Sequence, residues 1–387
     1  MKAIICGDVH IGAVFGLGKT NSAGGNTRID DYETTLNNII DYTISSGAEV
    51  FIQTGDLFET RNPTPEHIEI ADRAIRRLSD NHIFTIVIMG NHDYKKIGHS
   101  FTSAITSLPS RNYPNVRLIV EPENIIFTNK NGVKANLFMI PFRDKRMYSG
   151  KNQKEIVDSF NEHIKDLYAD INADLPTCVV GHNFFFKGNY FDFGGSEVFL
   201  YPESVKTADI VVMGHFHGFA NIKKDSPKCF YSGSMEKTNF GDQDSDKYFI
   251  EYDFLKKQEK ILKSNVRDLN DITIDLTEQT STTYLDFAKD KISTFNLENS
   301  IVRCRLKIRE NISGAINKGE IEKILNESGL FFLSKIIIEV VQTKAVVSSD
   351  ILQQKTDYDI FSAYAKSFGM TEKMLEDILS ESRSIIK

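Results

Sequence analysis

Five short motifs in this sequence could do chemistry, because each places acidic, amide or imidazole side chains directly after an apolar run. They read GDVH, GDLF, GNHD, GHN and GHFH, and their candidate residues are Asp8, His10, Asp56, Asn91, His92, Asp93, His182, His215 and His217. A glycine precedes the first polar residue each time, which suits a tight exit from a strand. Sites in open α/β sheets form outside the carboxyl ends of strands. We therefore expect the five motifs to meet in one place.

The residue types in these motifs favour a site for two divalent metal ions. Hard ions such as manganese accept carboxylate and carbonyl oxygens together with imidazole nitrogen. Asp8 and His10 are two positions apart on an extended chain and so point the same way, as do His215 and His217. One carboxylate can bridge ions ~3.5–4 Å apart. Any single motif would more often be surface polarity or a turn, but five of the nine histidines lie in these motifs, which favours one reaction site.

The elements that must position these motifs are short apolar runs separated by glycine-centred turns, which predict strands. The predicted strands are Ala3–Cys6, Val50–Gln53, Thr85–Met89, Asn136–Ile140, Cys178–Val180, Ile210–Met213, Cys229–Tyr231 and Tyr248–Tyr252. Helical spacing alternates with the first of them at 31–45, 64–78 and 99–108, and Thr64 and Pro65 supply a cap and a first-turn proline. Strand followed by helix, repeated, indicates an α/β domain, which we place at residues 1–255.

The pattern changes after residue 256. Residues 301–309 alternate strictly, which predicts a strand with one apolar face and one basic face. The basic face carries Arg303, Arg305, Lys307 and Arg309. A helix over 319–327, ended by Gly329, and a strand over 332–341 complete a small α+β unit. We predict a second domain at 256–345, followed at 346–387 by a polar linker and two short amphipathic helices.

Composition narrows the class of protein. With 41% hydrophobic and 26% charged residues, the 387-residue chain is not wholly disordered. No apolar run reaches the ~18–20 residues of a membrane span, and the opening MKAIICGDVH is not expected to be a signal peptide. The scattered cysteines predict reduced core thiols in a cytosolic protein; they are Cys6, Cys178, Cys229 and Cys304. A net charge of −7 argues against coating nucleic acid by bulk charge but leaves room for a local basic groove.

The order D-x-H, G-D, G-N-H-D, G-H, G-H-x-H resembles the calcineurin-like metallophosphoesterase superfamily. The segments GDLFETRNPTP, GHFHGFANI and CFYSGSMEKTNFGDQDSDKYFIEYDF resemble its SbcD-type nuclease branch, the family of the meiotic-recombination double-strand-break nuclease. The resemblance covers residues 1–255 closely and the rest by arrangement only. It implies a four-layer αββα sandwich, a small α+β capping domain and a carboxyl-terminal helical tail.

The resemblance also implies a role for each motif residue. One metal would be held by Asp8, His10, Asp56 and His217, and the other by Asp56, Asn91, His182 and His215. Asp56 would bridge the two ions, which would be manganese or, as the alternative, magnesium. His92 would be the acid that protonates the leaving 3′ oxygen or stabilises the transition state, and Asp93 would orient His92. Members of the branch often carry a histidine directly after G-D-[LIV]-F, where this chain has Glu59.

The implied activity is that of a DNA exo/endonuclease subunit of an SbcCD-like complex, which hydrolyses phosphodiester bonds at DNA ends in double-strand-break repair and recombination. The implied partners are DNA, an SbcC-type SMC-like ATPase that the tail helices would contact, and a second copy of the chain, with no membrane. The copies would meet through helices at 64–78 and 100–108. We expect a cytoplasmic or nucleoid-associated protein, with phage origin left open. The alternatives are a phosphoesterase for another substrate and a non-catalytic scaffold.

Three segments are further candidates for contact with DNA. The basic face of residues 301–309 is either a solvated strand face or a surface for phosphates. Lys95 and Lys96, and the cluster of Arg143, Lys145 and Arg146, could line a groove near the metals. The glycine-rich loop 12–28 is either a flexible surface loop or a loop that faces DNA or a partner.

Overall fold

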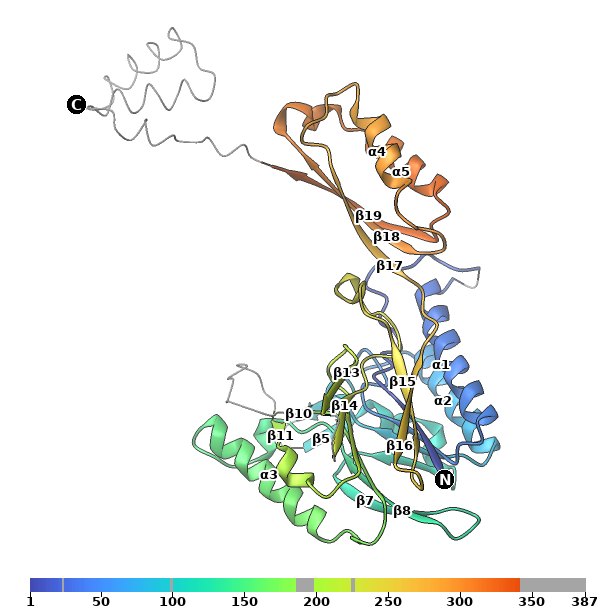
Figure 1. The fold of residues 1–387 in the computed structure, drawn as a ribbon, viewed down its shortest axis with the longest axis vertical. Coiled ribbons are helices and arrows are strands. Elements are labelled where there is room, and N and C mark those ends of the chain that lie inside the picture. Colours follow the sequence, from blue (N-terminus) through green and yellow to red (C-terminus); the bar gives the residue numbers. More distant parts are fainter. Residues whose placement is uncertain (23, 98–99, 186–197, 224–226, 342–387) are drawn as a thin grey trace, which may run out of the picture. The chain divides into compact units, whose positions relative to one another are not determined.

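Two six-stranded sheets organise the amino-terminal part of the computed structural model (Figure 1). The first has the order β16 (Gln258–Lys263), β15 (Tyr248–Asp253), β1 (Lys2–Cys6), β2 (Val50–Gln53), β3 (Phe84–Ile88) and β6 (Val116–Ile119). The second has the order β13 (Ala220–Lys223), β14 (Lys228–Tyr231), β12 (Ile210–Met213), β9 (Thr177–Gly181), β8 (Lys134–Ile140) and β7 (Glu123–Thr128). A pair of two-residue strands, β10 (Phe184–Phe185) and β11 (Phe199–Leu200), lies outside them. The structure describes residues 1–341 apart from residue 23 and segments 98–99, 186–197 and 224–226.

The sheets and three helices stack in four layers. Alternate residues of a strand face opposite sides of its sheet, so Ile5 and Leu137 meet in the core between the sheets. Ile4 faces the outer core covered by α1 (Thr27–Ser45) and α2 (Pro65–Asp80), and Phe138 faces the one covered by α3 (Gln153–Ala169). Figure 1 shows α1 and α2 on one side of the paired sheets and α3 on the other. The predicted αββα sandwich is confirmed.

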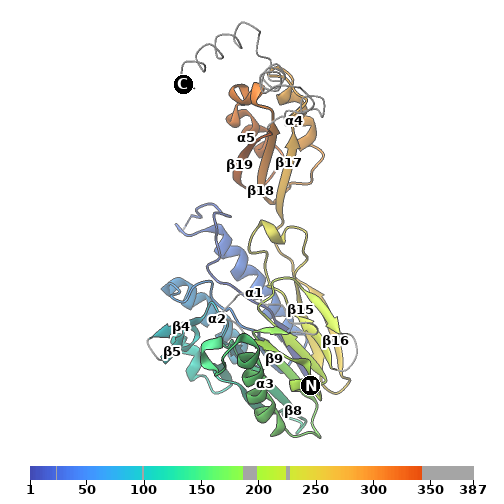
Figure 2. The ribbon, with the colours of Figure 1, turned by 90° about the vertical axis from the view of Figure 1, so that its left-hand side faces the viewer.

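The predicted elements of this part form with one exception, and one helix that was not predicted is present. All eight predicted strands are present, and the helices expected at 31–45 and 64–78 are α1 and α2. The helix expected at 99–108 is wrong, because β4 (Tyr94–Ile97) pairs with β5 (Ser100–Ser103) and a short 3₁₀ turn follows (Figure 2). Over a segment of only ten residues, this pattern of apolar residues fits either a helix or a hairpin followed by a turn. The helix α3 was missed.

The remaining elements are a three-stranded sheet and two helices. The sheet has the order β17 (Leu269–Asp275), β18 (Ile301–Ile308) and β19 (Phe332–Val340), and the helices are α4 (Tyr284–Ile292) and α5 (Lys318–Glu327). Every second residue of β18 is buried, as the alternation predicts. The structure divides into two compact units, of which unit 1 holds Met1–Ile272, Phe295–Cys304 and Glu322–Ile336, and unit 2 holds Thr273–Thr294, Arg305–Ile321 and the residues from 337 onward. The domain borders at 255 and 345 stay predictions, and the predicted linker and tail helices lie outside the described residues.

Acidic side chains engage the three arginines of the predicted basic face, Arg303 and Arg305 in β18 and Arg309 directly after it. Within unit 1, Arg303 pairs with Asp271. Within unit 2, Arg305 lies 2.9 Å from a carboxylate oxygen of Glu339, and Arg309 pairs with Glu278. The arginines of this alternating segment are therefore already bonded to carboxylates. This makes the segment less suitable as a surface that binds phosphates.

The loop 12–28 packs against distant parts of unit 1. Leu17 is buried in a cluster that includes Ile301. The ammonium of Lys19 lies 4.4 Å from the centre of the Phe331 ring, a cation–π contact. In its described residues, this loop is thus anchored by apolar and cation–π contacts, unlike the flexible surface loop that was one of the two expectations.

The four cysteines are free and buried, as the sequence predicts. Burial raises the pKa of the Cys6 thiol to about 12, and the nearby carboxylate of Asp8 adds to the shift, so Cys6 is a neutral core residue. Among the described helices, none is both long enough and apolar enough to cross a membrane.

A buried ion pair ties α1 to the segment after β14 that passes the predicted site. The guanidinium of Arg28 lies 3.1 Å from an oxygen of Glu236, and neither side chain is exposed. The hydroxyl of Thr35 donates to the other carboxylate oxygen at 2.9 Å. Two residues upstream, Ser234 forms a β-bridge with Asp8. This pair therefore holds the chain that lies against a predicted metal ligand.

We predict that Arg28→Met lowers the free energy of unfolding by about 3–5 kcal/mol, because it leaves the carboxylate of Glu236 buried without its cation. Urea unfolding followed by circular dichroism measures this. The matched control is Arg73→Met, since the ion pairs of Arg73 with Glu33 and Glu69 lie at the surface and should be worth about 1 kcal/mol or less. Equal losses in the two variants would contradict the assignment.

Candidate metal centre

The five motifs meet at the carboxyl ends of strands from both sheets. Asp8 follows β1, Asp56 follows β2 and Asn91 follows β3, which are neighbours in the first sheet. His182 follows β9, and His215 and His217 follow β12, its neighbour in the second. These strands run parallel within each sheet, so their carboxyl ends share an edge. The predicted convergence is what the structure has.

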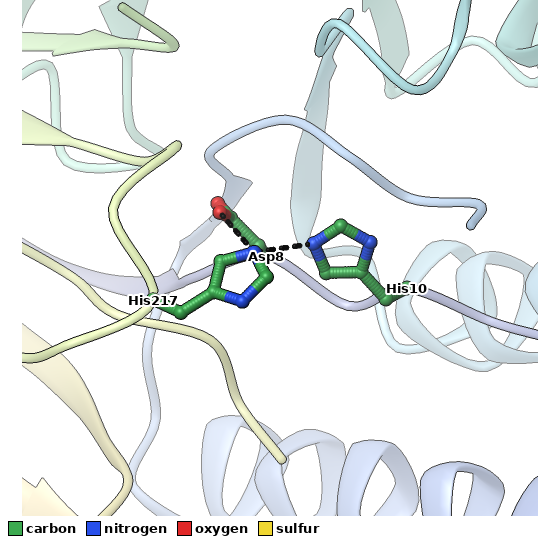
Figure 3. Close-up of side chains that lie close together, drawn as sticks. All are labelled: Asp8, His10 and His217. Carbon is green, nitrogen blue, oxygen red and sulfur yellow. Dashed lines mark hydrogen bonds and ion pairs between the residues drawn. The ribbon is translucent and has the colours of Figure 1, made fainter. Parts of the chain in front are cut away.

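Asp8, His10 and His217 form one group of side chains (Figure 3). The Nε2 atoms of His10 and His217 are 3.0 Å apart. The Nε2 atom of His217 also lies 4.0 Å from Oδ2 of Asp8, whose side chain has no exposed surface. The backbone N–H of His215 donates to that same oxygen at 2.9 Å and thereby fixes the carboxylate. Two imidazole nitrogens and a carboxylate oxygen thus face a common point.

Asp56, His182 and His215 form a second group, and the amide of Asn91 lies among them. Oδ1 of Asn91 is 3.0 Å from Nε2 of His182 and 2.8 Å from Nδ1 of His215. Nε2 of His182 is also 3.2 Å from Oδ2 of Asp56. The structure thus brings together all seven residues that were predicted as metal ligands.

Asp56 lies between the two groups. Its Oδ2 atom is 3.2 Å from Nε2 of His182 in one group and 3.7 Å from Nε2 of His10 in the other. Its Oδ1 atom accepts the backbone N–H of His92 at 2.8 Å. Burial alone would raise the pKa of Asp56, but the positive charges of His182, His10 and His92 outweigh it and hold that pKa below its usual range. A single oxygen of an ionised carboxylate therefore faces both groups, which is one way for a carboxylate to bridge two ions.

The hydrogen bonds of His182 show that a cation fits this place. Its Nδ1 lies 3.0 Å from the carbonyl oxygen of Thr54, which can only accept, so Nδ1 carries a proton. Nε2 then faces oxygen acceptors on Asn91 and Asp56, and a neutral ring would have no proton to offer them. Burial lowers the pKa of His182, but Asp56 and Asp8 raise it to about 9. A positive charge between Nε2 of His182 and these oxygens is therefore favourable, and either a proton or a metal ion can supply it.

Three of these residues have a backbone conformation that side-chain-bearing residues rarely adopt. The φ angles of His10, Asp56 and His215 are 53°, 52° and 79°. Such left-handed conformations are uncommon outside glycine, cost about 1–3 kcal/mol each and cluster at functional sites. Strain of this kind is therefore present at three residues that would bind metal, and at four other non-glycine residues of the described structure.

The glycines before the motif residues admit close contacts. A Cβ atom on Gly55, whose φ is +118°, would lie 2.1 Å from Nδ1 of His182. A Cβ atom on Gly90 would lie 2.1 Å from both the nitrogen and Oδ1 of Asp56. The G-D and G-N-H-D patterns thus exist because neighbouring ligands occupy the space of a side chain.

His92 lies at the edge of the two groups, with its side chain 36% exposed. Its Nδ1 is 2.7 Å from the carbonyl oxygen of Glu59 and donates to it, because a carbonyl can only accept. Nε2 is the nitrogen left to act on a bound molecule. The ring also packs edge-on against His10, with centroids 4.9 Å apart.

Asp93 binds backbone rather than an imidazole. Its carboxylate accepts the N–H groups of Leu57, Phe58 and Gly90 at 3.0–3.1 Å, and it is fully buried. Burial and then the charge of Asp56 raise the pKa of Asp93 to about 6, against the effect of these N–H groups. Asp93 thus joins the loop after β2 to the loop after β3, and the partner that orients His92 is the carbonyl of Glu59.

Sequence reasoning missed three supporting residues. The hydroxyl of Thr54 donates to Asp8 at 3.3 Å, in addition to the bond from its carbonyl to His182. The ammonium of Lys247 is buried and donates to the carbonyl of His217 at 3.0 Å. The side chain of Glu59 lies beside His10. Only Glu59 had a signal, since it stands inside a motif.

The predicted basic groove is only partly present. Arg143 is 3% exposed, pairs with Glu121 and donates to the carbonyl of Val120, so it is a structural residue. Arg146 pairs with Asp144. Lys95, which donates to the side chain of Asn62 at 2.8 Å, follows the GNHD motif at the surface beside the site.

Comparison with known proteins matches this architecture to a family. The calcineurin-like phosphoesterase family matches residues 1–219, more than half of the chain. Exonuclease subunit 1 of Enterobacteria phage T4 is 29% identical over 229 residues, which are 58% of this chain and 59% of the phage protein. The chain thus matches less than two thirds of that relative's length.

Solved structures add two distant likenesses. The crystal structure of the protein TT1561 of Thermus thermophilus aligns over 68% of this chain and 98% of that one, with 12% identity and a TM-score of 0.41. A dimetal phosphatase from Danio rerio aligns over 68% and 99%, with 9% identity and a TM-score of 0.40. These scores are too low to weigh, so the fold assignment rests on the family match and on the sheet topology.

We predict that the stabilising effect of a divalent metal grows as the pH rises from 6.5 to 9. The raised pKa of His182 means that its proton stabilises the metal-free protein fully below about 6.5 and is lost as the pH passes about 9. A bound metal replaces that charge. Thermal unfolding in chelator and in manganese chloride, with oxygen excluded, should show a gap in Tm that widens with pH.

The control for this experiment is His182→Ala, in which the gap should shrink at every pH, while His163→Ala on α3 should behave as the native chain. A gap that stays constant or narrows toward pH 9 would contradict the role of His182.

Proposed function

This chain belongs to the calcineurin-like phosphoesterase family, and we propose that it is the nuclease subunit of an SbcCD-like complex that hydrolyses phosphodiester bonds at DNA ends in double-strand-break repair and recombination. The observation that carries the hydrolase part is the single oxygen of Asp56 that faces both groups of metal-binding side chains. The DNA part is supported by the likeness to the phage exonuclease subunit and by the additional α+β elements after the sandwich.

Two divalent ions would be held by the residues of the two groups. The proposed ligands are Asp8, His10, Asp56 and His217 for one ion and Asp56, Asn91, His182 and His215 for the other. When bound, such ions lower the pKa of water and stabilise the charge that develops on a phosphate during in-line displacement. Manganese is the proposed metal, since it accepts imidazole nitrogen together with carboxylate oxygen.

His92 is the proposed acid. With Nδ1 engaged by the carbonyl of Glu59, a protonated ring directs Nε2–H away from that bond. As the bond from phosphorus to the 3′ oxygen breaks, His92 gives this proton to the oxygen and becomes neutral. The partial exposure of the ring is consistent with access for a phosphodiester.

Exposed cations beside His92 are the proposed contacts for neighbouring phosphates. Lys95 and Lys96 follow the GNHD motif, and Lys96 is exposed, as is Arg61 in the loop after β2. The arginines of residues 301–309 are less suited to this role, because acidic partners already engage Arg303, Arg305 and Arg309. The net charge of −7 suggests modest affinity for DNA without a partner.

The proposed partners are an SbcC-type SMC-like ATPase and a second copy of the chain. The tail helices that would contact the ATPase lie outside the described residues. Of the two helices expected between copies, α2 is present, whereas 100–108 forms the end of a hairpin and a 3₁₀ turn. Co-purification with a candidate ATPase, with nuclease assays in the presence and absence of ATP, tests this part.

We predict that His92→Asn lowers the rate of DNA cleavage by about 10²–10⁴-fold while leaving metal binding intact, because asparagine cannot donate a proton as an acid. Manganese-dependent cleavage of linear double-stranded DNA and calorimetric metal titration measure the two effects. The control is His163→Asn, an exposed histidine on α3. Full nuclease activity of His92→Asn would refute the assigned role, and activity of the native chain on small phosphoesters but not on DNA would favour the alternative substrate class.

We predict that Lys95→Ala weakens DNA binding and lowers the slope of log K against log [salt] by about 0.9, the loss of one phosphate contact. Fluorescence anisotropy with labelled DNA at several salt concentrations measures the slope. Lys165→Ala removes the same charge from an exposed position on α3 and should leave the slope unchanged. An unchanged slope in Lys95→Ala would remove this lysine from the DNA contact.

A further inference from the structure

The carboxylate of Glu59 reaches a nitrogen of the buried ligand His10. Its Oε2 atom lies 2.9 Å from Nδ1 of His10, and the two side chains are 15% and 1% exposed. The contact is a close ion pair rather than an aligned hydrogen bond, and within the described structure this Nδ1 atom has no hydrogen-bond partner. A buried ring nitrogen without a bond is costly, so an acceptor at this distance is significant.

The other nitrogen of His10 faces the metal groups. Nε2 is 3.0 Å from Nε2 of His217 and 3.7 Å from Oδ2 of Asp56. A histidine that binds metal through one nitrogen keeps its proton on the other, and the acceptor of that proton decides which nitrogen is free and how the ring is turned. His10 can present Nε2 as a ligand only when Nδ1 carries the proton.

We propose that Glu59 is a positioning residue that accepts the Nδ1 proton of His10 and thereby holds the lone pair of Nε2 toward one of the metals. The inference rests on the two-metal site of the proposed function and names a residue that acts through a ligand without being one. It assigns a structural role at the site to Glu59, the residue directly after G-D-L-F in this chain.

The main chain of Glu59 is held independently of its side chain. Its N–H donates to the carbonyl of Ile11 at 3.1 Å, next to His10, and its carbonyl accepts from His92. A further bridge joins Ile11 to Phe58. Substitution of the Glu59 side chain therefore removes the carboxylate from His10 while the backbone contact that orients His92 remains.

His10, Glu59 and His92 could instead hold a metal ion of their own, since one ligand atom from each lies within 4.8 Å of the others. The position of His92 favours the positioning role. Its Nδ1 is 2.7 Å from the main-chain oxygen of Glu59 and 3.7 Å from the carboxylate, so that nitrogen is already engaged by the backbone.

The test compares Glu59→Ala, Glu59→Gln and the control Glu69→Gln, in which an exposed glutamate on α2 is changed. Calorimetric titration of the chelated full-length chain with manganese should give two sites in the native protein. Glu59→Ala should weaken one of them by about 10–100-fold. Glu59→Gln, whose amide oxygen still accepts, should weaken it less, and the control should not change it.

A second readout reports on the ring itself. Long-range ¹⁵N correlation spectra of the chelated protein, with His10 assigned by substitution, should show neutral His10 protonated at Nδ1. The Nε2-protonated form should gain population in Glu59→Ala and less in Glu59→Gln. If Glu59→Ala does not fold, Glu59→Leu, which keeps much of the side-chain volume but has no acceptor, takes its place in both measurements.

Two results would overturn the proposal. One is an unchanged metal affinity and an unchanged tautomer of His10 in both Glu59 variants. The other is a third manganese site in the native chain that Glu59→Ala abolishes, since the carboxylate would then be a ligand. If metal binding depends on Glu59 as expected but the native chain does not cleave DNA, the proposed function fails and the role of Glu59 stands.

Discussion

A buried group of acceptor atoms that needs a positive charge is the constraint on which the rest of this structure depends. With the Nδ1 proton of His182 bound to the carbonyl of Thr54, the Nε2 lone pair faces oxygens of Asn91 and Asp56. Such atoms repel one another unless a cation lies among them. The paired sheets hold them in place rigidly, because their strands end at a common edge and three packed cores lie behind them. The same cores must offset the backbone strain of about 1–3 kcal/mol at each left-handed ligand.

Several arginines of the described residues are used in ion pairs within the protein. Arg28 and Arg143 are buried in ion pairs, and the arginines of residues 301–309 are bonded to carboxylates of other segments. With a net charge of −7, the chain as a whole does not attract an anionic substrate by bulk charge. Attraction for a phosphodiester would then depend chiefly on the charge of the bound ions, together with a small group such as Lys95 and Lys96. Under the proposed function, substrate binding would then be coupled to metal binding.

Much of the fold could be predicted because its signals are local. Alternating or continuous apolar runs marked all eight predicted strands, and Thr64 with Pro65 marked the start of α2, where the threonine side chain accepts from the N–H of His67. The apolar pattern gave a wrong prediction where the segment that carries it is short. At 99–108 the same apolar spacing suits a hairpin and a 3₁₀ turn, in which Ala104, Ile105 and Leu108 are buried without a helix. Pairing of β4 with β5 decided the outcome.

The sequence by itself determined which residues meet at the site, because each candidate ligand directly follows an apolar strand and the strands of a parallel sheet end at one edge. Only the tertiary structure decided what these residues touch. Asp93 binds the N–H groups of Leu57 and Phe58 rather than His92, Glu59 turns its carboxylate to His10, and Arg303 bonds to Asp271. The members of each of these bonded pairs are more than thirty positions apart. Spacing along one strand shows which face a side chain occupies, whereas its partner depends on how other segments pack against that face.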